Sequence, residues 1–284
     1  MEVFMKTTYA PKPENAKALL DLAHAYQLEI DKKPERFIKK MRTNDSFLVT
    51  VPQLLENGLQ PRNPLVAVIG DSVTAGHFEW IMPIPEIREI MNAMAQGKAQ
   101  YPMPTMEIYD TQNSYVEKFR QKLIEKYERT AVSIVNAGIA GDNLVFMSQR
   151  LERDVISLQP DLVIINGSIN WGSYFGTADD FKKILIQMVQ DIKAKTTADI
   201  VLLTPNMDLY NYISEVDTDL YTRIPKIREV ALEEDVCFVD VYSIWKAYEA
   251  KGYDVKDLLA NGINHPCIAG HEAYAIALMK LFED

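Results

Sequence analysis

The sequence predicts an α/β fold, in which a parallel sheet of about five strands lies between two layers of helices, with an N-terminal helical extension. Two observations carry this prediction. From Leu65 onward, five short apolar runs alternate with longer segments whose apolar residues recur at helical spacing, which is typical of repeated βαβ units. The chain has 284 residues, 48% of them hydrophobic and 25% charged, which suits one large domain with a small appendage.

The N-terminal part of the chain shows only helical patterns. Residues 14–31 carry apolar residues at helical spacing, and a second short amphipathic run follows Pro34. The stretch Asn57–Pro64 is dense in residues that break regular structure. We therefore divide the chain into an N-terminal helical extension, residues 1–63, and a main domain, residues 64–284. The extension either caps the main domain or forms a dimer contact.

The main domain contains five expected strands and five expected helices. The strands are short, apolar and rich in β-branched residues, as buried parallel strands are: residues 65–69, 131–136, 161–165, 199–204 and 236–240. The helices are amphipathic and occupy residues 114–127, 144–158, 179–195, 219–234 and 270–283. Pro225 is expected to kink or restart the fourth of these helices.

The alternation also predicts where ligands bind. In open parallel sheets, ligands bind beyond the carboxyl ends of the strands. Functional residues are therefore expected directly after the apolar runs, in residues 70–76, 137–143, 166–171 and 205–208.

Composition and charge exclude several classes of partner. The formal net charge is -10, which disfavours nucleic acid and anionic membranes because both require a clustered positive field. No stretch reaches the roughly 18 uncharged apolar residues of a membrane span, and the first residues lack the apolar core of a signal peptide. A cytoplasmic location is the resulting expectation. Cys237 and Cys267 are the two cysteines, and we expect both as free thiols.

Four polar motifs follow the expected strands. The turn Gly70-Asp71-Ser72 would hold a serine hydroxyl at the mouth of the sheet, although this triplet alone is ordinary turn chemistry. Residues 136–143 (NAGIAGDN) offer glycine N–H groups, and residues 166–170 (NGSIN) end in a side-chain amide. Residues 261–266 (NGINHP) place a histidine before the last helix. All four motifs are expected on one rim of the sheet.

Taken in this order, the motifs over residues 65–284 resemble those of the SGNH (GDSL-like) hydrolase family. The resemblance implies a flavodoxin-like three-layer sandwich and a serine hydrolase. It assigns Ser72 as the nucleophile, His265 as its base, and Gly141 and Asn170 as oxyanion donors. The chemistry of these residues agrees, because a histidine can take the serine proton near neutral pH and amide donors stabilise the developing oxyanion.

Neither a metal nor a cofactor is expected. His265, Cys267 and His271 have a spacing that matches no usual zinc pattern. The sequence also lacks a G-x-S-x-G elbow, a P-loop and a G-x-G-x-x-G loop, which argues against an ordinary α/β-hydrolase, a nucleotide hydrolase and a dinucleotide enzyme. Of the remaining histidines, we expect His24 to be a packing or surface residue, and His77 and His271 to be structural.

Two positions depart from the family pattern. Trp171 stands where an aspartate often follows the oxyanion asparagine, and it either lines the substrate pocket or packs in the core. Asn261 stands in the place of the usual triad aspartate. Three explanations remain open: Asn261 presents its amide oxygen to His265, another carboxylate such as Asp254 or Asp257 assists, or the chain is a weakened form. The first predicts that Asn261→Asp raises kcat/KM on an activated acetate ester.

The segment between the nucleophile turn and the next helix, residues 77–112, is a long insertion rich in Met, Pro and aromatic residues. Insertions of this length in a compact domain usually have a function. Either a lid over the site or a subunit contact is expected. Changes of KM in Trp80→Ala and Met82→Ala would indicate a lid.

The predicted function is hydrolysis of a small O-acyl ester, through an acyl-Ser72 intermediate. An O-acetyl group on a carbohydrate is the favoured substrate, because the histidine turn is similar to that of carbohydrate acetylesterases within the family. The expected partner is thus a small-molecule or oligosaccharide ester, and a homo-oligomer is compatible with the sequence. The alternatives are a lipase, thioesterase or acyltransferase of the same fold, or a pseudoenzyme that binds an acylated ligand.

Overall fold

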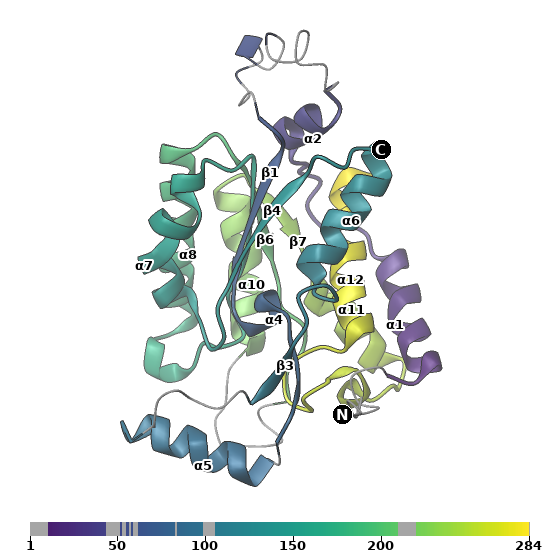
Figure 1. The fold of residues 1–284 in the computed structure, drawn as a ribbon, viewed down its shortest axis with the longest axis vertical. Helices are drawn as coiled ribbons and strands as arrows, with labels where there is room; N and C mark the ends of the chain where they lie inside the picture. The colour runs from purple at the N-terminus through teal and green to yellow at the C-terminus, as the bar shows by residue number, and fades with distance from the viewer. Residues whose placement is uncertain are drawn as a thin grey trace, which may run out of the picture.

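The computed structural model contains a five-stranded parallel sheet between two layers of helices (Figure 1). The structure describes residues 11–43, 52, 55–56, 58, 62–82, 84–98, 106–209 and 220–283. The strands of this sheet are β1 (Leu65–Gly70), β4 (Ser133–Gly138), β5 (Leu162–Asn166), β6 (Asp199–Leu203) and β7 (Cys237–Val239). Their order is β4-β1-β5-β6-β7. The first strand, β1, is thus an inner strand that pairs with β4 on one side and with β5 on the other. The predicted α/β/α sandwich is confirmed.

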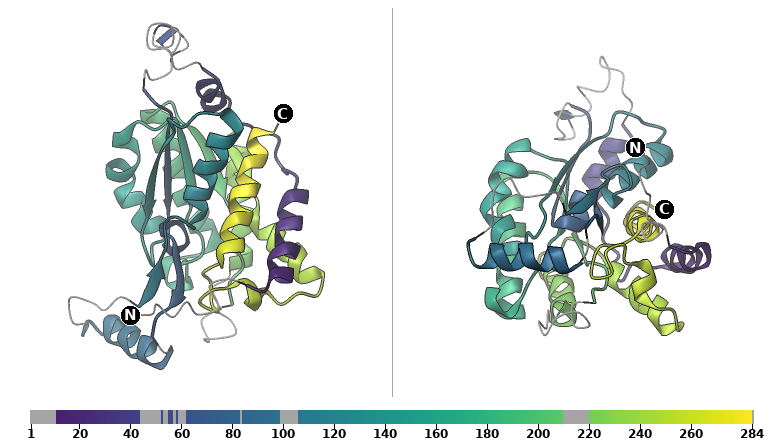
Figure 2. Two further views of the ribbon diagram at one scale, coloured as in Figure 1. Left: turned by 45° about the vertical axis from the view of Figure 1, so that its right-hand side comes forward. Right: turned by 60° about the horizontal axis from the view of Figure 1, so that its bottom comes forward.

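Side chains of the central strands alternate between two cores because successive residues of a strand point to opposite faces. In β1, Val66 and Val68 enter one core, and Ala67 and Ile69 enter the other. The first core is covered by α1 (Pro13–Ala25), α6 (Tyr115–Tyr127), α11 (Val241–Ala250) and α12 (Ile268–Met279). The second is covered by α7 (Leu144–Asp154), α8 (Ala178–Lys195) and α10 (Leu220–Glu233), as the turned view in Figure 2 shows.

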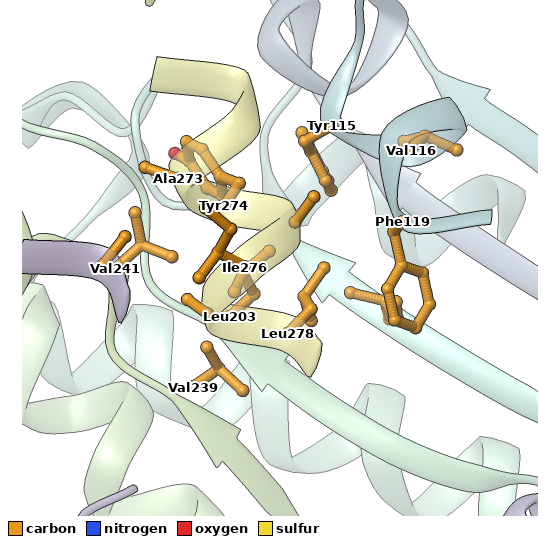
Figure 3. Packing of buried hydrophobic residues seen from close by; sticks show 14 of the residues in the cluster. Tyr115, Val116, Phe119, Leu203, Val239, Val241, Ala273, Tyr274, Ile276 and Leu278 are labelled. Atoms are coloured by element: carbon orange, nitrogen blue, oxygen red, sulfur yellow. The ribbon is translucent and has the colours of Figure 1, made fainter. Parts of the chain in front are cut away.

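Helix α12, which follows the motif that contains His265, is packed on all sides. Nine of its residues, from Ala269 to Leu278, are buried, and their side chains meet β6, β7 and α6 (Figure 3). The Tyr274 ring stacks on Tyr115 of α6, with 4.9 Å between ring centroids. This packing fixes the helix that follows the turn of His265.

The N-terminal helices belong to the same core as the sheet. Helix α1 lies against α12 and α11 (Figure 1) and ends at Ala25, earlier than the helical pattern of residues 14–31. Helix α2 (Glu35–Met41) buries Phe37 and Met41 in the first core. Its Lys40 is fully buried and forms an ion pair of 2.7 Å with Asp161 at the start of β5. These helices therefore cap the sandwich.

Several elements were not expected from the sequence. Helix α11 lies between β7 and the last helix, whereas the short helix α4 (Ser72–Ala75) agrees with the strand-to-helix turn expected at Ser72. The segment 77–112 contains an antiparallel hairpin of β2 (His77–Trp80) and β3 (Glu107–Tyr109), with helix α5 (Ile84–Ala95) between its strands. Four short 3-10 helices complete the described fold: η1 (Ile156–Leu158), η2 (Ser173–Phe175), η3 (Val255–Leu258) and η4 (Lys280–Phe282).

Three further expectations can be compared with the fold. Helix α10 continues through Pro225 as one helix, so the expected restart is not seen. Cys237 and Cys267 are buried free thiols. In the part of the chain that the structure describes, no helix is both long enough and apolar enough to cross a membrane.

Candidate active site

Ser72 stands at the first position of α4, directly after β1. The turn is tight because Gly70 has no side chain: a Cβ there would lie 2.0 Å from the Thr74 hydroxyl oxygen. Asp71 is the N-cap, and its carboxylate accepts the Val73 N–H at 2.9 Å. Gly76 ends the helix in the left-handed region, with φ of 89°. Local turn chemistry thus places the serine hydroxyl at the carboxyl edge of the sheet.

His265 is held by a turn that Asn261 organises. The Asn261 side-chain oxygen accepts the backbone N–H groups of Ile263, Asn264 and His265, at 2.9 to 3.0 Å. The turn is tied to the segment after β6, because the Asn206 side-chain amide donates to the Asn264 carbonyl at 2.8 Å. These hydrogen bonds therefore fix the backbone position of His265.

The structure brings the imidazole of His265 to the hydroxyl of Ser72. Nε2 and Oγ are 2.9 Å apart, a hydrogen-bond distance, although the residues are far apart in sequence. Both residues are buried. Burial lowers the pKa of His265 below its ordinary 6.5, an effect that the charge of Glu107 opposes. The imidazole is consequently neutral near pH 7 and can accept the serine proton.

The loop after β4 carries Gly141 toward the same rim. Asn136 links this strand to the nucleophile turn, since its amide donates to the Thr74 carbonyl at 2.7 Å. Gly141 has φ of 72°, a conformation that favours glycine. The Asn170 amide, from the loop after β5, donates to the Asp142 carbonyl at 3.1 Å. Gly141 and Asn170 therefore belong to one connected pair of loops.

Arg150 of α7 braces this loop, and sequence reasoning missed it. Its guanidinium forms a buried ion pair with the Asp142 carboxylate, at 2.6 Å from Nη2. It also donates to the carbonyls of Ala137 at 2.8 Å and Gly70 at 3.1 Å. A single side chain thus ties the end of β1, the end of β4 and the following loop together. Its sequence neighbours gave no signal, because arginine on a helix is usually a surface residue.

Asn261 does not point its polar atoms at the imidazole. Its oxygen serves the backbone of its own turn, and its amide donates to the Asn264 side-chain oxygen at 2.9 Å. The two carboxylates considered as substitutes are also used elsewhere. Asp254 caps η3 through the Lys256 N–H, and Asp257 accepts from the Asn15 amide at 2.9 Å. None of these contacts reaches the ring of His265.

The Nδ1 side of the imidazole faces the β2–β3 hairpin instead. Nδ1 of His265 lies 3.1 Å from the Phe78 carbonyl oxygen and 3.3 Å from Oε1 of Glu107. The other oxygen of Glu107 contacts Nδ1 of His77. His77 was expected to be structural, and Glu107 was not singled out at all. Sequence reasoning missed them because the hairpin lies in an insertion without a clear strand pattern.

Two further residues that the sequence singled out, Trp171 and His271, are structural in their contacts. Trp171 is buried in the second core, and its indole N–H donates to the Gly176 carbonyl at 3.0 Å. His271 accepts the Tyr115 N–H at 3.1 Å on Nδ1, and burial lowers its pKa to about 3. Among the described residues, no group of three or more His, Cys, Asp or Glu side chains is arranged to hold a metal ion.

Comparisons with known proteins identify the family and the fold. Residues 68–273, more than half of the chain, match the model of the GDSL-like Lipase/Acylhydrolase family. An acetylxylan esterase of Geobacillus stearothermophilus is 28% identical over 169 residues, which cover 54% of this chain and 74% of the relative.

Solved structures share the fold. The acetylxylan esterase Axe2 of Geobacillus stearothermophilus superposes with a TM-score of 0.56 and 22% identity, over 78% of this chain and 96% of that chain. A lipase/acylhydrolase of Enterococcus faecalis gives 0.55 and 20%, over 76% and 95%. With the family model covering the sheet and every motif of the rim, the chain belongs to the GDSL-like lipase/acylhydrolase family of ester hydrolases.

Proposed function

We propose that the chain is a serine esterase that hydrolyses small O-acyl esters, with O-acetyl groups on carbohydrates as the preferred substrates. The observation that carries the proposal is the 2.9 Å hydrogen bond between Ser72 Oγ and His265 Nε2. A serine paired with a neutral histidine, beside amide donors, is the arrangement that acyl transfer to serine requires.

The reaction proceeds in two steps. Ser72 Oγ bonds to the ester carbon while its proton passes to His265 Nε2, and the protonated imidazole then returns this proton to the leaving alcohol oxygen. Water next attacks the acyl-Ser72 ester, which releases the carboxylic acid and restores the serine. The oxyanion of each step accepts hydrogen bonds from the N–H groups of Ser72 and Gly141 and from the Asn170 amide.

An exposed aromatic surface on the segment that follows Asn170 supports a carbohydrate substrate. Tyr174 is 86% exposed and Phe146 is 46% exposed. Both contact Phe175, with ring centroids 4.4 Å and 5.9 Å away, and Tyr174 and Phe175 follow Asn170 in the same loop. Flat apolar rings suit the CH faces of sugars, and exposed aromatic groups of this kind commonly mark binding sites. The relative named an acetylxylan esterase points to the same class of substrate.

The direct test is a panel of acyl esters of increasing chain length and of acetylated oligosaccharides. Wild type is expected to prefer acetyl esters, and Ser72→Ala is expected to lose turnover. A fluorophosphonate should label wild type at Ser72 and leave the variant unlabelled. Activity that survives Ser72→Ala would contradict the proposal, and an unlabelled wild type that still binds acylated ligands would indicate a pseudoenzyme.

The aromatic surface has its own test. Tyr174→Ala should raise KM for acetylated oligosaccharides and leave KM for a small activated acetate ester unchanged. Leu158→Ala is the matched control, because Leu158 is a 38% exposed apolar residue that precedes β5, at the opposite edge of the sheet. Equal KM values for the oligosaccharides in wild type and Tyr174→Ala would remove the support for a carbohydrate subsite.

A further inference from the structure

We propose that Glu107 is the positioning carboxylate of His265 and that His77 in turn holds Glu107, so that the β2–β3 hairpin supplies what Asn261 does not. The inference rests on the proposed function, because it concerns the group that orients the same histidine and stabilises its protonated form. The geometry is a chain of four side chains: Ser72, His265, Glu107 and His77, each in contact with the next.

The two oxygens of Glu107 are divided between the two histidines. Oε1 faces Nδ1 of His265 at 3.3 Å, and Oε2 accepts from Nδ1 of His77. Glu107 is only 9% exposed, and a buried carboxylate is stable when it is paired and hydrogen-bonded. The contact with His77 leaves Glu107 a single orientation, in which its other oxygen meets the catalytic ring.

Hydrogen bonds close the hairpin at both ends, and the end next to α4 is tied to the loop that follows Ser72. The Asp110 N–H donates to the Gly76 carbonyl at 2.8 Å, directly after the nucleophile helix, and the Ile81 N–H donates to the Met106 carbonyl at 2.8 Å. Phe78 is fully buried and packs against the His271 ring, with centroids 4.7 Å apart. The backbone between these anchors carries both His77 and Glu107.

The Phe78 carbonyl is the competing partner of Nδ1, at 3.1 Å. It can fix the tautomer of a neutral imidazole as well as a carboxylate can. It cannot match a negative charge once the proton of Ser72 has made the ring an imidazolium, because a carbonyl carries only a dipole. The two possible partners can therefore be told apart by turnover. If Glu107 has this role, removing its negative charge should lower kcat. If the Phe78 carbonyl alone has this role, removing the charge of Glu107 should leave kcat unchanged.

The first test is Glu107→Gln, which keeps the shape and removes the charge. Replacing the acid of a serine-protease triad by its amide lowers kcat by about 10⁴-fold, and we expect a loss of at least about 10²-fold here, with little change in KM. The groups that face the His265 ring are Glu107, His77 and His271. Because the Glu107 carboxylate raises the pKa of His265, the acid limb of the residual kcat/KM should move to lower pH.

Matched controls are Asp254→Asn and Asp257→Asn. Both remove a carboxylate that was considered as a substitute for the acid missing at position 261, and both side chains make their contacts away from the ring. They should keep the wild-type kcat and pH profile. A full kcat in Glu107→Gln would overturn the proposal and leave the Phe78 carbonyl as the orienting group. A loss in either control equal to that in Glu107→Gln would also overturn it, because the effect would not be specific to Glu107.

His77 provides an independent variant if Glu107→Gln fails to fold. His77→Ala should lower kcat with KM retained, and His77→Asn, which keeps a donor near the position of Nδ1, should regain part of the loss. A wild-type kcat in His77→Ala would remove His77 from the proposal. Ser72→Ala separates the two ideas: if it abolishes turnover while Glu107→Gln does not, the esterase stands and the role of Glu107 is wrong.

Discussion

Replacing Arg150 by methionine should damage both stability and turnover, for a reason visible in its contacts. Met keeps most of the length of the side chain and removes every hydrogen bond to Asp142, Ala137 and Gly70. The Asp142 side chain is only 3% exposed, so the variant leaves a buried carboxylate without its main partner. Breaking a buried pair in this way typically costs about 3–5 kcal/mol.

Urea unfolding gives the stability, and kcat on an activated acetate ester gives the catalytic effect. Asp142 lies next to Gly141, and its backbone carbonyl accepts a hydrogen bond from the Asn170 amide. Loss of the Arg150 contacts should therefore displace both proposed oxyanion donors. A displacement of 1 Å can cost about 10²-fold in rate, and we expect a fall in kcat of this size. KM should change little, because the substrate surface is untouched.

Arg153→Met is the matched control. Arg153 is on the same helix and also pairs with an aspartate, Asp154, but its side chain is 73% exposed. Exposed pairs contribute less than about 1 kcal/mol. Adding Asp142→Asn to Arg150→Met should restore part of the lost stability by removing the unpaired charge. If the two arginine variants lose the same stability, the bracing role of Arg150 is refuted.

Three further predictions follow from the site. Asn261→Asp should give no rise in kcat/KM on an activated acetate ester, because residue 261 faces its own turn; a clear rise would restore it as the orienting residue. Burial raises the pKa of Asp71 from 3.8 to about 7, so its ionisation should cost the fold up to about 4 kcal/mol as pH rises from about 4 to 7, and Asp71→Asn should flatten this decline in urea titrations. Gly138→Ala should lower stability by about 1–3 kcal/mol and reduce kcat, because its Cβ would lie 2.3 Å from the Ala75 backbone nitrogen; wild-type melting and turnover would show that α4 can shift freely.

The fold was predictable because its signals are local. Most strands of the main sheet are apolar runs buried on both faces, and the helices between strands are long enough to show their period. The edge strand β4 was expected to be buried like the others, but its residues are exposed or half-buried. Helix α11 escaped notice because its ten residues provide only a few turns and follow directly on the apolar run of β7, although Val241, Ile244, Trp245 and Tyr248 are buried at helical spacing. The strands β2 and β3 have four and three residues, too short for an alternating pattern.

The site was predictable where its residues adjoin the main strands and, for His265, through the family resemblance. Ser72, Gly141 and Asn170 follow β1, β4 and β5, so the topology alone places them on one rim. Glu107 reaches His265 from a hairpin whose docking depends on tertiary contacts such as those of Phe78. Asn261 illustrates the opposite error: its place in a motif suggested a side-chain role toward the ring, whereas its oxygen satisfies three backbone donors.

The hairpin has a consequence for how heat affects the enzyme. β2 and β3 form a two-stranded sheet separate from the main sheet, and such pairs are marginally stable unless other elements support them. The hairpin is supported locally, by the Asp110–Gly76 hydrogen bond and the packing of Phe78 on His271, and a small unit held in this way opens at lower free energy than the main core. If Glu107 orients His265, opening of the hairpin removes this carboxylate and stops turnover. Loss of activity on heating should then occur at a lower temperature than melting of the sandwich and should reverse on cooling. The working temperature of this enzyme would then be set by an inserted hairpin and not by its fold.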